Sequence, residues 1–559
     1  MYFLNKSQLS QKKTLSLQAK IRKNKMMNRT YISLFSCAGV GCYGFKMAGF
    51  DCVASNELLE PRIEVQRVNH KCKYESGYIC GDATKEETHQ RIYDEIEMWR
   101  KKEGLEQVDV VFATPPCQGM STANYKKTDH EQIRNSLVVE AIKMIKGIHP
   151  KVFVFENVRA FMKSTCTDLS GKDMSIKESI FKNLSEDYNI YWKVINFKDY
   201  GVPSSRPRTI VIGTSKELKH TTPLQLFPTR QNEILLRDSI GGFPRLAYCE
   251  KDKKDPFHFA RPFPEYMLDW IKNLKEGETA FDNPDETKPY QLDKDGNKIV
   301  NKGAYMGNKY RRLIWDRPGA CIATRSDIMS SQDTIHPCDN RVLSIRELMT
   351  LMTIPNSFQW TDHDSELTVD NSDEYLKENE GNIRRCIGEA VPTQIGRDVA
   401  EKISRMLDYE DFVNSGEGNG TGNFFIDAHK AFGEILPHFA FNEINKKKED
   451  VENVSVKVIG IGDFLTFIPQ LISYYSHINS ITIDVFNLTS EEEIKFLSIL
   501  GEMKIGSNVS INIPEKIAEF ESYNLIVENG RCRHFFITET GVKRTTKKPQ
   551  ADPLQLSLF

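Results

Sequence analysis

The fold can be inferred most directly from one segment, Val108-Asp109-Val110-Val111-Phe112-Ala113-Thr114-Pro115-Pro116-Cys117-Gln118. Its first six residues form an apolar run, and continuous rather than alternating apolarity is typical of a strand buried on both faces of a parallel sheet. The cysteine stands just beyond that strand, where open α/β sheets carry their chemistry. The prolines restrict the backbone before it, so the loop that carries the thiol is stiff. Taken alone, Cys117 is more simply interpreted as a small packed hydrophobe than as a nucleophile.

The sequence on both sides of this stretch repeats the same alternation of short apolar runs and longer amphipathic segments. Segments such as 136–145 have the apolar spacing of a helix. Together they predict a doubly wound α/β domain. The further apolar runs are 31–35, 51–55, 152–155, 192–197 and 209–212.

Size and composition set limits on the function. A chain of 559 residues is too long for one core and predicts two to four domains. The net charge of −2 does not mark a nucleic-acid binder, although a local basic surface can still do that work. The twelve cysteines include no C-x-x-C pair, so we expect no zinc module and no metal site. Without a signal peptide or an apolar membrane span, the pattern favours a cytoplasmic protein with no membrane partner.

Changes in composition suggest where the domains begin and end. The leader is basic and is interpreted as disordered or as a DNA-contacting arm, and Met26 or Met27 is an alternative start. Residues 216–345 have weak periodicity and are interpreted as an inserted, loop-rich domain. The expected boundaries are a leader at 1–29, an α/β domain at 30–215 that resumes at 346–409, a linker at 410–422, an accessory α/β domain at 423–545 and a tail at 546–559.

Polar residues suited to chemistry follow several of the predicted strands. A turn of small residues at 35–41 would let a cofactor approach the backbone. Glu57 and Asp82 are suited to ribose hydroxyls and to an adenine amino group. Glu156 would be partly desolvated at a strand end, which raises a carboxyl pKa and suits proton donation. The ordinary alternative is a solvated surface acid for Glu57 and Asp82 and a helix-capping acid for Glu156.

Two arginines form the last of these candidate motifs along the chain. Arg206 and Arg208 are two residues apart and share one face if the chain is extended, so they could hold a phosphate or an anionic loop. The ordinary alternative is a solvated surface pair. The order of glycine turn, two acids, Pro-Pro-Cys, a further acid and an arginine pair is much harder to produce by chance than any one motif.

In this order the motifs resemble those of the DNA (cytosine-5)-methyltransferases. The resemblance runs from about Tyr31 to about Leu407, roughly two-thirds of the chain, and the Pro115-Pro116-Cys117-Gln118 motif is highly specific. The remaining matching segments are 34–39, Asn56-Glu57, Asp82, Glu156-Asn157-Val158, Arg206 with Arg208, 310–318, His336-Pro337, 341–347 and 388–392.

The resemblance implies the fold and the site. The fold would be a Rossmann-like, S-adenosylmethionine-dependent methyltransferase domain with a mixed, mostly parallel sheet, an inserted target-recognition domain at 216–345 and an extra C-terminal α/β domain. Cys117 would attack C6 of a flipped-out cytosine, and Glu156, Arg206 and Arg208 would complete the catalytic group. Segment 119–134 would close over the site. Contacts to S-adenosylmethionine would come from Phe35, Ser36, Cys37, Ala38, Gly39, Val40, Glu57, Asp82, Pro115, Leu137, Glu389 and Ala390.

Four residues depart from the family pattern. Cys37 stands where glycine is usual, and Val40-Gly41 replaces a double glycine. Ser204 replaces a common glutamine, and Glu389 replaces an asparagine near the cofactor. These departures concern cofactor affinity and not the class of reaction.

The implied partner is double-stranded DNA, methylated by a monomer in the bacterial nucleoid, either within a restriction–modification system or by a solitary enzyme. Two alternatives stay open: a catalytically silent DNA- or clamp-binding protein on this fold, and an RNA cytosine-5 methyltransferase. The terminal residues Gln555, Leu556, Ser557, Leu558 and Phe559 resemble the peptide by which bacterial proteins bind the replicative sliding clamp. A frayed apolar tail is the ordinary alternative for them.

Overall fold

A computed structural model of the chain describes residues 28–116, 137–218, 221, 223–292, 294–295, 297–300, 307–362 and 367–414, and beyond them seven strands between 440 and 544. The chain divides into two compact units. One is Met27–Met406, the other contains the strands beyond Leu407, and each is described by itself. No helix in the described part of the chain is long and apolar enough to cross a membrane.

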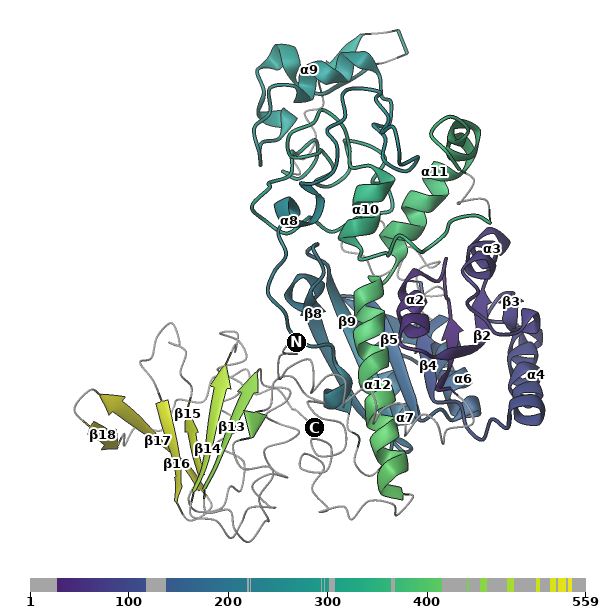
Figure 1. Cartoon of the computed structure of the whole chain (residues 1–559), viewed down its shortest axis with the longest axis vertical. Coiled ribbons are helices and arrows are strands. Elements are labelled where there is room, and N and C mark those ends of the chain that lie inside the picture. The colour runs from purple at the N-terminus through teal and green to yellow at the C-terminus, as the bar shows by residue number, and fades with distance from the viewer. Residues whose placement is uncertain are drawn as a thin grey trace, which may run out of the picture. The chain divides into compact units, whose positions relative to one another are not determined.

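The first unit is built on a seven-stranded sheet of order β3-β2-β1-β4-β5-β9-β8 (Figure 1). The strands from β3 to β5 pair in parallel, β9 is antiparallel to β5, and β8 is antiparallel to β9. The sheet is therefore mixed and mostly parallel, as expected. Its strands are β1 (Thr30–Leu34), β2 (Asp51–Glu57), β3 (Tyr78–Cys80), β4 (Val110–Ala113), β5 (Val152–Val158), β8 (Tyr188–Asn196) and β9 (Pro207–Ser215).

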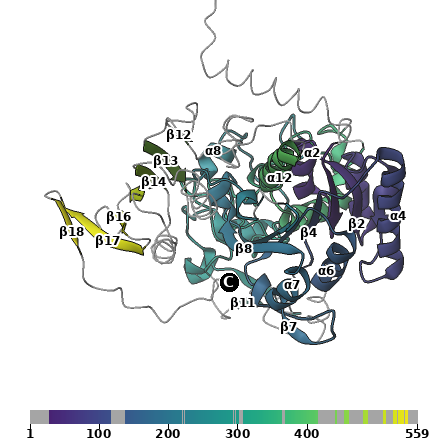
Figure 2. The ribbon, with the colours of Figure 1, turned by 90° about the horizontal axis from the view of Figure 1, so that it is seen from below.

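Helices cover both faces of this sheet, and Figure 2 shows it between α2 and α12 on one side and α6 and α7 on the other. Because both faces are covered, the central strands β4 and β5 are largely apolar, and Phe153, Phe155 and Val211 are fully buried. The helices of this layered part are α2 (Val40–Met47), α3 (Glu60–Val68), α4 (Glu86–Glu103), α6 (Leu137–Ile148), α7 (Ile176–Leu184), α10 (Ile345–Leu351), α11 (Ser372–Glu389) and α12 (Thr393–Asn414).

Helix α12 returns to the beginning of the domain and touches α2 backbone to backbone. A Cβ on Gly44 would lie 2.3 Å from the backbone nitrogen of Arg397, and a Cβ on Gly396 would lie 2.1 Å from the carbonyl oxygen of Gly41. Only glycine permits this approach. The contact brings the end of α11, and with it Glu389, back to the turn after β1.

The structure corrects three expectations about element boundaries. The short strand β3 was missed, since three residues are too few for a periodic pattern. Arg29, assigned to the leader, is buried, and its Nη1 lies 3.3 Å from Asp109 Oδ1, so it belongs to the α/β domain. The linker assigned to 410–422 begins too early, because α12 continues to Asn414.

The inserted region has few regular elements, as its weak periodicity predicts, and buried arginines hold its loops together. Arg312 donates to the carbonyl oxygens of His336 and Ile271, at 2.9 and 2.8 Å. Arg341 pairs with both carboxylate oxygens of Glu347, at 2.7 and 2.9 Å. The elements are α8 (Leu236–Ile240), α9 (Leu268–Ile271), β10 (Tyr290–Leu292) and β11 (Lys298–Val300); a separate small sheet of β6 (Thr165–Thr167) and β7 (Asp173–Ser175) precedes the region.

The second unit contains a seven-stranded sheet of order β12-β13-β14-β15-β16-β17-β18. Strands β13, β14 and β15 are parallel, and the following strands pair antiparallel. Strands β16 and β17 form an antiparallel hairpin in which Glu528 pairs with Arg531. The strands are β12 (Ala440–Phe441), β13 (Asn453–Ile459), β14 (Ser480–Phe486), β15 (Val509–Asn512), β16 (Tyr523–Glu528), β17 (Arg531–Thr538) and β18 (Gly541–Arg544).

Candidate active site

The candidate residues meet at one edge of the first sheet. The carboxyl ends of β1 to β5 lie at this edge because the strands are parallel, and β9 begins there because it is antiparallel to β5. The chain order reverses between β1 and its neighbours β2 and β4, which is the switch point at which open α/β sheets bind ligands. Loops far apart in the sequence are therefore brought to one place by the topology.

The turn after β1 is tight and unusually strained. Phe35, Cys37 and Gly39 have φ angles of 56°, 48° and 78°. Glycine adopts this left-handed region freely, whereas the two other residues do so at a cost, which is common at functional sites. Gln66 fastens the turn by donating to Ser36 Oγ at 2.8 Å and to the Cys37 carbonyl at 2.6 Å. Ala38 and Val40, the remaining predicted cofactor contacts of this turn, are buried.

The two predicted cofactor acids are held in fixed positions at neighbouring strand ends. Glu57 ends β2, and its Oε2 accepts the Cys37 backbone N–H at 2.8 Å. Asp82 follows β3, and its Oδ1 accepts the Thr84 backbone N–H at 2.9 Å, which lowers the pKa of that carboxyl. Both groups keep lone pairs for further donors. A strained backbone turn flanked by two oriented carboxylates fits the adenosine end of S-adenosylmethionine.

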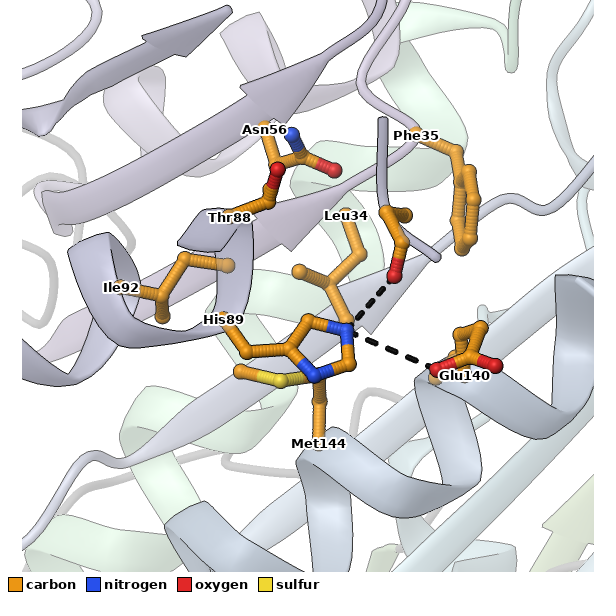
Figure 3. A pocket seen from close by; sticks show the side chains of 10 residues that line it. Leu34, Phe35, Asn56, Thr88, His89, Ile92, Glu140 and Met144 are labelled. Atoms are coloured by element: carbon orange, nitrogen blue, oxygen red, sulfur yellow. Dashed lines mark hydrogen bonds and ion pairs between the residues drawn. The ribbon is translucent and has the colours of Figure 1, made fainter. Parts of the chain in front are cut away.

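A pocket lies beside these groups and contains a residue that sequence reasoning missed (Figure 3). His89, on α4, donates from Nε2 to the carbonyl oxygen of Ala83 at 2.6 Å, and the same nitrogen lies 3.6 Å from Glu140 Oε2. The histidine thereby fixes the loop that carries Asp82. No sequence pattern indicated a role for His89, because the rest of α4 has the composition of a polar surface helix. Phe35 and Leu34 supply the apolar wall of the pocket.

Glu156 is the acid near the end of the central strand β5. It lies in β5 and is buried, and its Oε1 makes no hydrogen bond within the described part of the chain. Burial raises the pKa of Glu156, and the opposing effect of Arg208 and Arg206 does not cancel this rise. Its neighbour Asn157 donates to the carbonyl oxygen of Pro115 at 2.8 Å, so the acid and the proline segment before Cys117 are tied together.

The two arginines have different surroundings. The Nε of Arg208 lies 3.4 Å from Glu156 Oε1, and the side chain is partly exposed. Arg206 is almost fully buried, and its terminal nitrogens donate to the carbonyl oxygens of Ile322 at 3.1 Å and Gly388 at 2.7 Å. Arg206 is therefore a positioning residue that joins the end of α11 to the segment at 319–323. Cys321, which the sequence did not mark, faces both guanidinium groups. Burial raises the pKa of its thiol, but the two positive charges have the larger effect, so the pKa is lowered.

Glu389 and Ala390 are also at this edge. Glu389 is the last residue of α11, and its Oε2 lies 2.7 Å from Nη2 of Arg62 and 3.6 Å from Cys37 Sγ. Arg62 in turn lies 3.5 Å from Glu57 Oε1. Sequence reasoning missed Arg62, although its place five residues after Glu57 put it near the site. Ala390 is buried directly after the helix.

Other predicted site residues lie partly or wholly outside the described residues. Cys117 and the predicted closing segment 119–134 are outside them. Pro115 and Leu137, which flank that gap, are respectively buried and half-buried at the same sheet edge. The described part of the chain thus places Glu57, Asp82, Glu156 and Glu389 at one edge of the sheet.

One cluster elsewhere has the residue types of a metal site. Ligand atoms of His336, Cys338 and Asp339 lie within 4.8 Å of one another. However, His336 Nδ1 already accepts the backbone N–H of Asp339 at 2.9 Å, and Asp339 pairs with Arg341 at 3.0 Å. These groups are used to hold the loop together.

The family model and the sequence relatives match the first unit. Residues 29–405 match the family model described as C-5 cytosine-specific DNA methylase. The Type II methyltransferase M1.HgaI of Avibacterium volantium is 30% identical over 388 residues, covering 66% of this chain and 97% of the relative. M1.HphI of Haemophilus parahaemolyticus, also a Type II methyltransferase, is 28% identical over 382 residues, covering 68% and 88%. A solved structure described as a prophage-encoded DNA modification methyltransferase (E. coli) has a TM-score of 0.46 and 18% identity, covering 68% and 99%.

Proposed function

The chain belongs to the family of C-5 cytosine-specific DNA methylases, and from that premise we propose how its residues carry out the reaction. It is a DNA (cytosine-5)-methyltransferase of the restriction–modification type. The turn after β1 and the carboxylates of Glu57 and Asp82 would hold S-adenosylmethionine, which would supply the methyl group. The observation that supports the proposal best is Glu156, a buried acid with a raised pKa that Asn157 ties to the segment preceding Cys117.

The C5 atom of cytosine is a poor nucleophile, and the protein activates it through Cys117. The thiolate adds to C6, which gives C5 enamine character, and a thiolate is both nucleophilic near neutral pH and able to leave again. Glu156 donates a hydrogen bond to N3 and neutralises the charge that develops on the ring. Arg208 holds the Glu156 carboxyl in place. Once the activated C5 has taken the methyl group, with S-adenosylhomocysteine as the leaving group, loss of the C5 proton releases Cys117 by β-elimination.

None of these ring atoms can be reached inside a duplex, so the enzyme acts on a flipped-out cytosine. The segment 119–134 closes over the base, and the inserted region at 216–345 selects the sequence through contacts to base edges. The enzyme works at the chromosomal DNA of the bacterial cytoplasm. We propose that one copy acts at each site; a second-order dependence of the rate on enzyme concentration would contradict this.

Bisulfite sequencing tests the function and reveals the target. DNA from cells that lack cytosine methylation is sequenced after expression of the wild type or of an empty vector. We expect 5-methylcytosine at one short motif in the wild-type sample alone. Methylated cytosine in RNA but in no DNA motif would favour an RNA cytosine-5 methyltransferase instead. If folded protein is present and neither DNA nor RNA contains methylated cytosine, the catalytically silent alternative is favoured.

We also propose that the terminal peptide recruits the enzyme to newly replicated DNA. Gln555 to Phe559 lie outside the described residues, and the proposal rests on their sequence: Leu558 and Phe559 are suited to an apolar pocket. Purified sliding clamp should retain the full chain and not a chain that lacks the last five residues. Equal retention of the two proteins would contradict the proposal.

A further inference from the structure

An ion pair joins the two halves of the cofactor site. Nη2 of Arg62 lies 2.7 Å from Oε2 of Glu389, 327 residues away in the sequence. The Arg62 side chain is 14% exposed and that of Glu389 is 29% exposed, so the pair is sheltered but can still be reached from solvent. Within the described part of the chain, the buried Nε of Arg62 has no hydrogen-bond partner.

The positions of both residues oppose the helix dipoles. Arg62 is in the first turn of α3, where the partial charge of the helix is positive, and Glu389 is the last residue of α11, where it is negative. A cation at a helix N-terminus, such as Arg62, and an anion at a helix C-terminus, such as Glu389, each destabilise their own helix. Local helix stability therefore does not explain these residues, and such mismatches are expected at functional sites.

The pair lies against the turn after β1 and the acid assigned to the ribose. Cys37 Sγ is 3.6 Å from Glu389, and Glu57 Oε1 is 3.5 Å from Arg62. The Cys37 thiol adds no charge there, since its hydrogen bond with Cys386 and its burial raise its pKa well above the usual value. One positive and one negative charge thus stand side by side next to the ribose position.

We propose that Arg62 and Glu389 are specificity-determining residues for the amino-acid end of S-adenosylmethionine. The inference rests on the proposed placement of the ribose at Glu57. In the cofactor the amino-acid end is joined to the ribose through sulfur, and it carries an α-carboxylate and an α-ammonium group. The guanidinium of Arg62 takes the carboxylate and the carboxylate of Glu389 takes the ammonium group, so the zwitterion lies antiparallel to the ion pair with each charge facing its opposite.

The affinities for two ligands distinguish recognition of the amino-acid end from a purely structural role of the ion pair. S-Adenosylhomocysteine carries the amino-acid end, whereas 5′-deoxy-5′-methylthioadenosine has the same adenosine and thioether but lacks it. Calorimetric affinities of the full chain for both ligands should show a clear preference of the wild type for S-adenosylhomocysteine. Arg62→Gln and Glu389→Gln should each weaken S-adenosylhomocysteine by about tenfold or more and leave methylthioadenosine unchanged, because a hydrogen bond to a charged group is lost only with the first ligand.

A charge-exchanged variant and a matched control sharpen the test. Arg62→Glu with Glu389→Arg restores the ion pair and gives each helix end its favourable charge, so its thermal midpoint should equal or exceed that of the wild type. Its preference for S-adenosylhomocysteine should nevertheless stay lost, since the two charges have changed places. The control is Arg67→Gln on the same helix, whose partners are the more exposed Glu60, Glu64 and Glu75; it should alter neither affinity.

The outcomes are distinguishable. Equal weakening of both ligands by the single variants, or recovery of the preference by the exchanged variant, would show that the pair only holds α3 against α11 and would overturn the inference alone. A wild type that binds both ligands equally would do the same. A wild type that binds neither ligand would overturn the cofactor assignment, and the inference with it.

Discussion

Replacing Cys117 by serine is expected to lower methyl transfer to DNA by about 10⁴-fold or more. The serine hydroxyl is almost wholly protonated at neutral pH and is a far weaker nucleophile than a thiolate, so C6 is no longer attacked and C5 is not activated. Removal of the group that forms the covalent bond typically has an effect of this size. The measurement is incorporation of labelled methyl groups from S-adenosylmethionine into long DNA of mixed sequence, which contains the target whatever it is.

A covalent trap separates loss of the nucleophile from loss of folding. DNA made with 5-fluorocytosine cannot lose a proton from C5, so the adduct with Cys117 should persist and migrate as a protein–DNA complex under denaturing conditions. The wild type and Cys249→Ser, which alters an exposed cysteine elsewhere, should both form it. Cys117→Ser should form none while it still binds S-adenosylhomocysteine. An adduct in the Cys117→Ser protein would place the nucleophile elsewhere.

Replacing Glu156 by glutamine is expected to lower the same rate by about 10²- to 10⁴-fold, the range typical for loss of a general acid. The amide keeps the shape of the side chain but cannot neutralise charge on the cytosine ring by giving up a proton. Burial raises the pKa of Glu156, so the wild-type carboxyl keeps its proton to a higher pH than an exposed glutamate. The rate of the wild type should therefore fall on the alkaline side as that proton is lost, and the rate of Glu156→Gln should lack this fall.

The control for this prediction is Glu186→Gln, a change of an exposed acid away from the sheet edge, which should leave the rate within about twofold. Binding of S-adenosylhomocysteine should survive in both variants, since Glu156 faces Arg208 and not the turn after β1. A wild-type rate in Glu156→Gln would remove this residue from the mechanism, whatever the fate of Cys117.

The buried strands were predictable because each carries its signal locally. Mostly apolar segments of four to six residues marked β1, β2, β4, β5, β8 and β9, whereas β3, with only three residues, was too short to be recognised. The inserted region was predictable only as irregular. The fixed conformation of its loops depends on buried arginines such as Arg312. The partners of Arg312 are backbone carbonyls, which no sequence pattern identifies.

Strand burial and motif spacing are local properties of the chain, so the α/β class, the order of the motifs and the chemistry of the edge residues could be inferred from the amino acids alone. Which of these residues face the site depends on contacts between distant segments. The tertiary structure placed Arg206 in the interior between Ile322 and Gly388, and it fixed the loop at Asp82 through His89. It also paired Arg62 with Glu389 across 327 residues. The physical reason is the same in each case: a buried polar group must find a partner, and the close contact of α2 with α12 determines which distant groups are near enough to provide it.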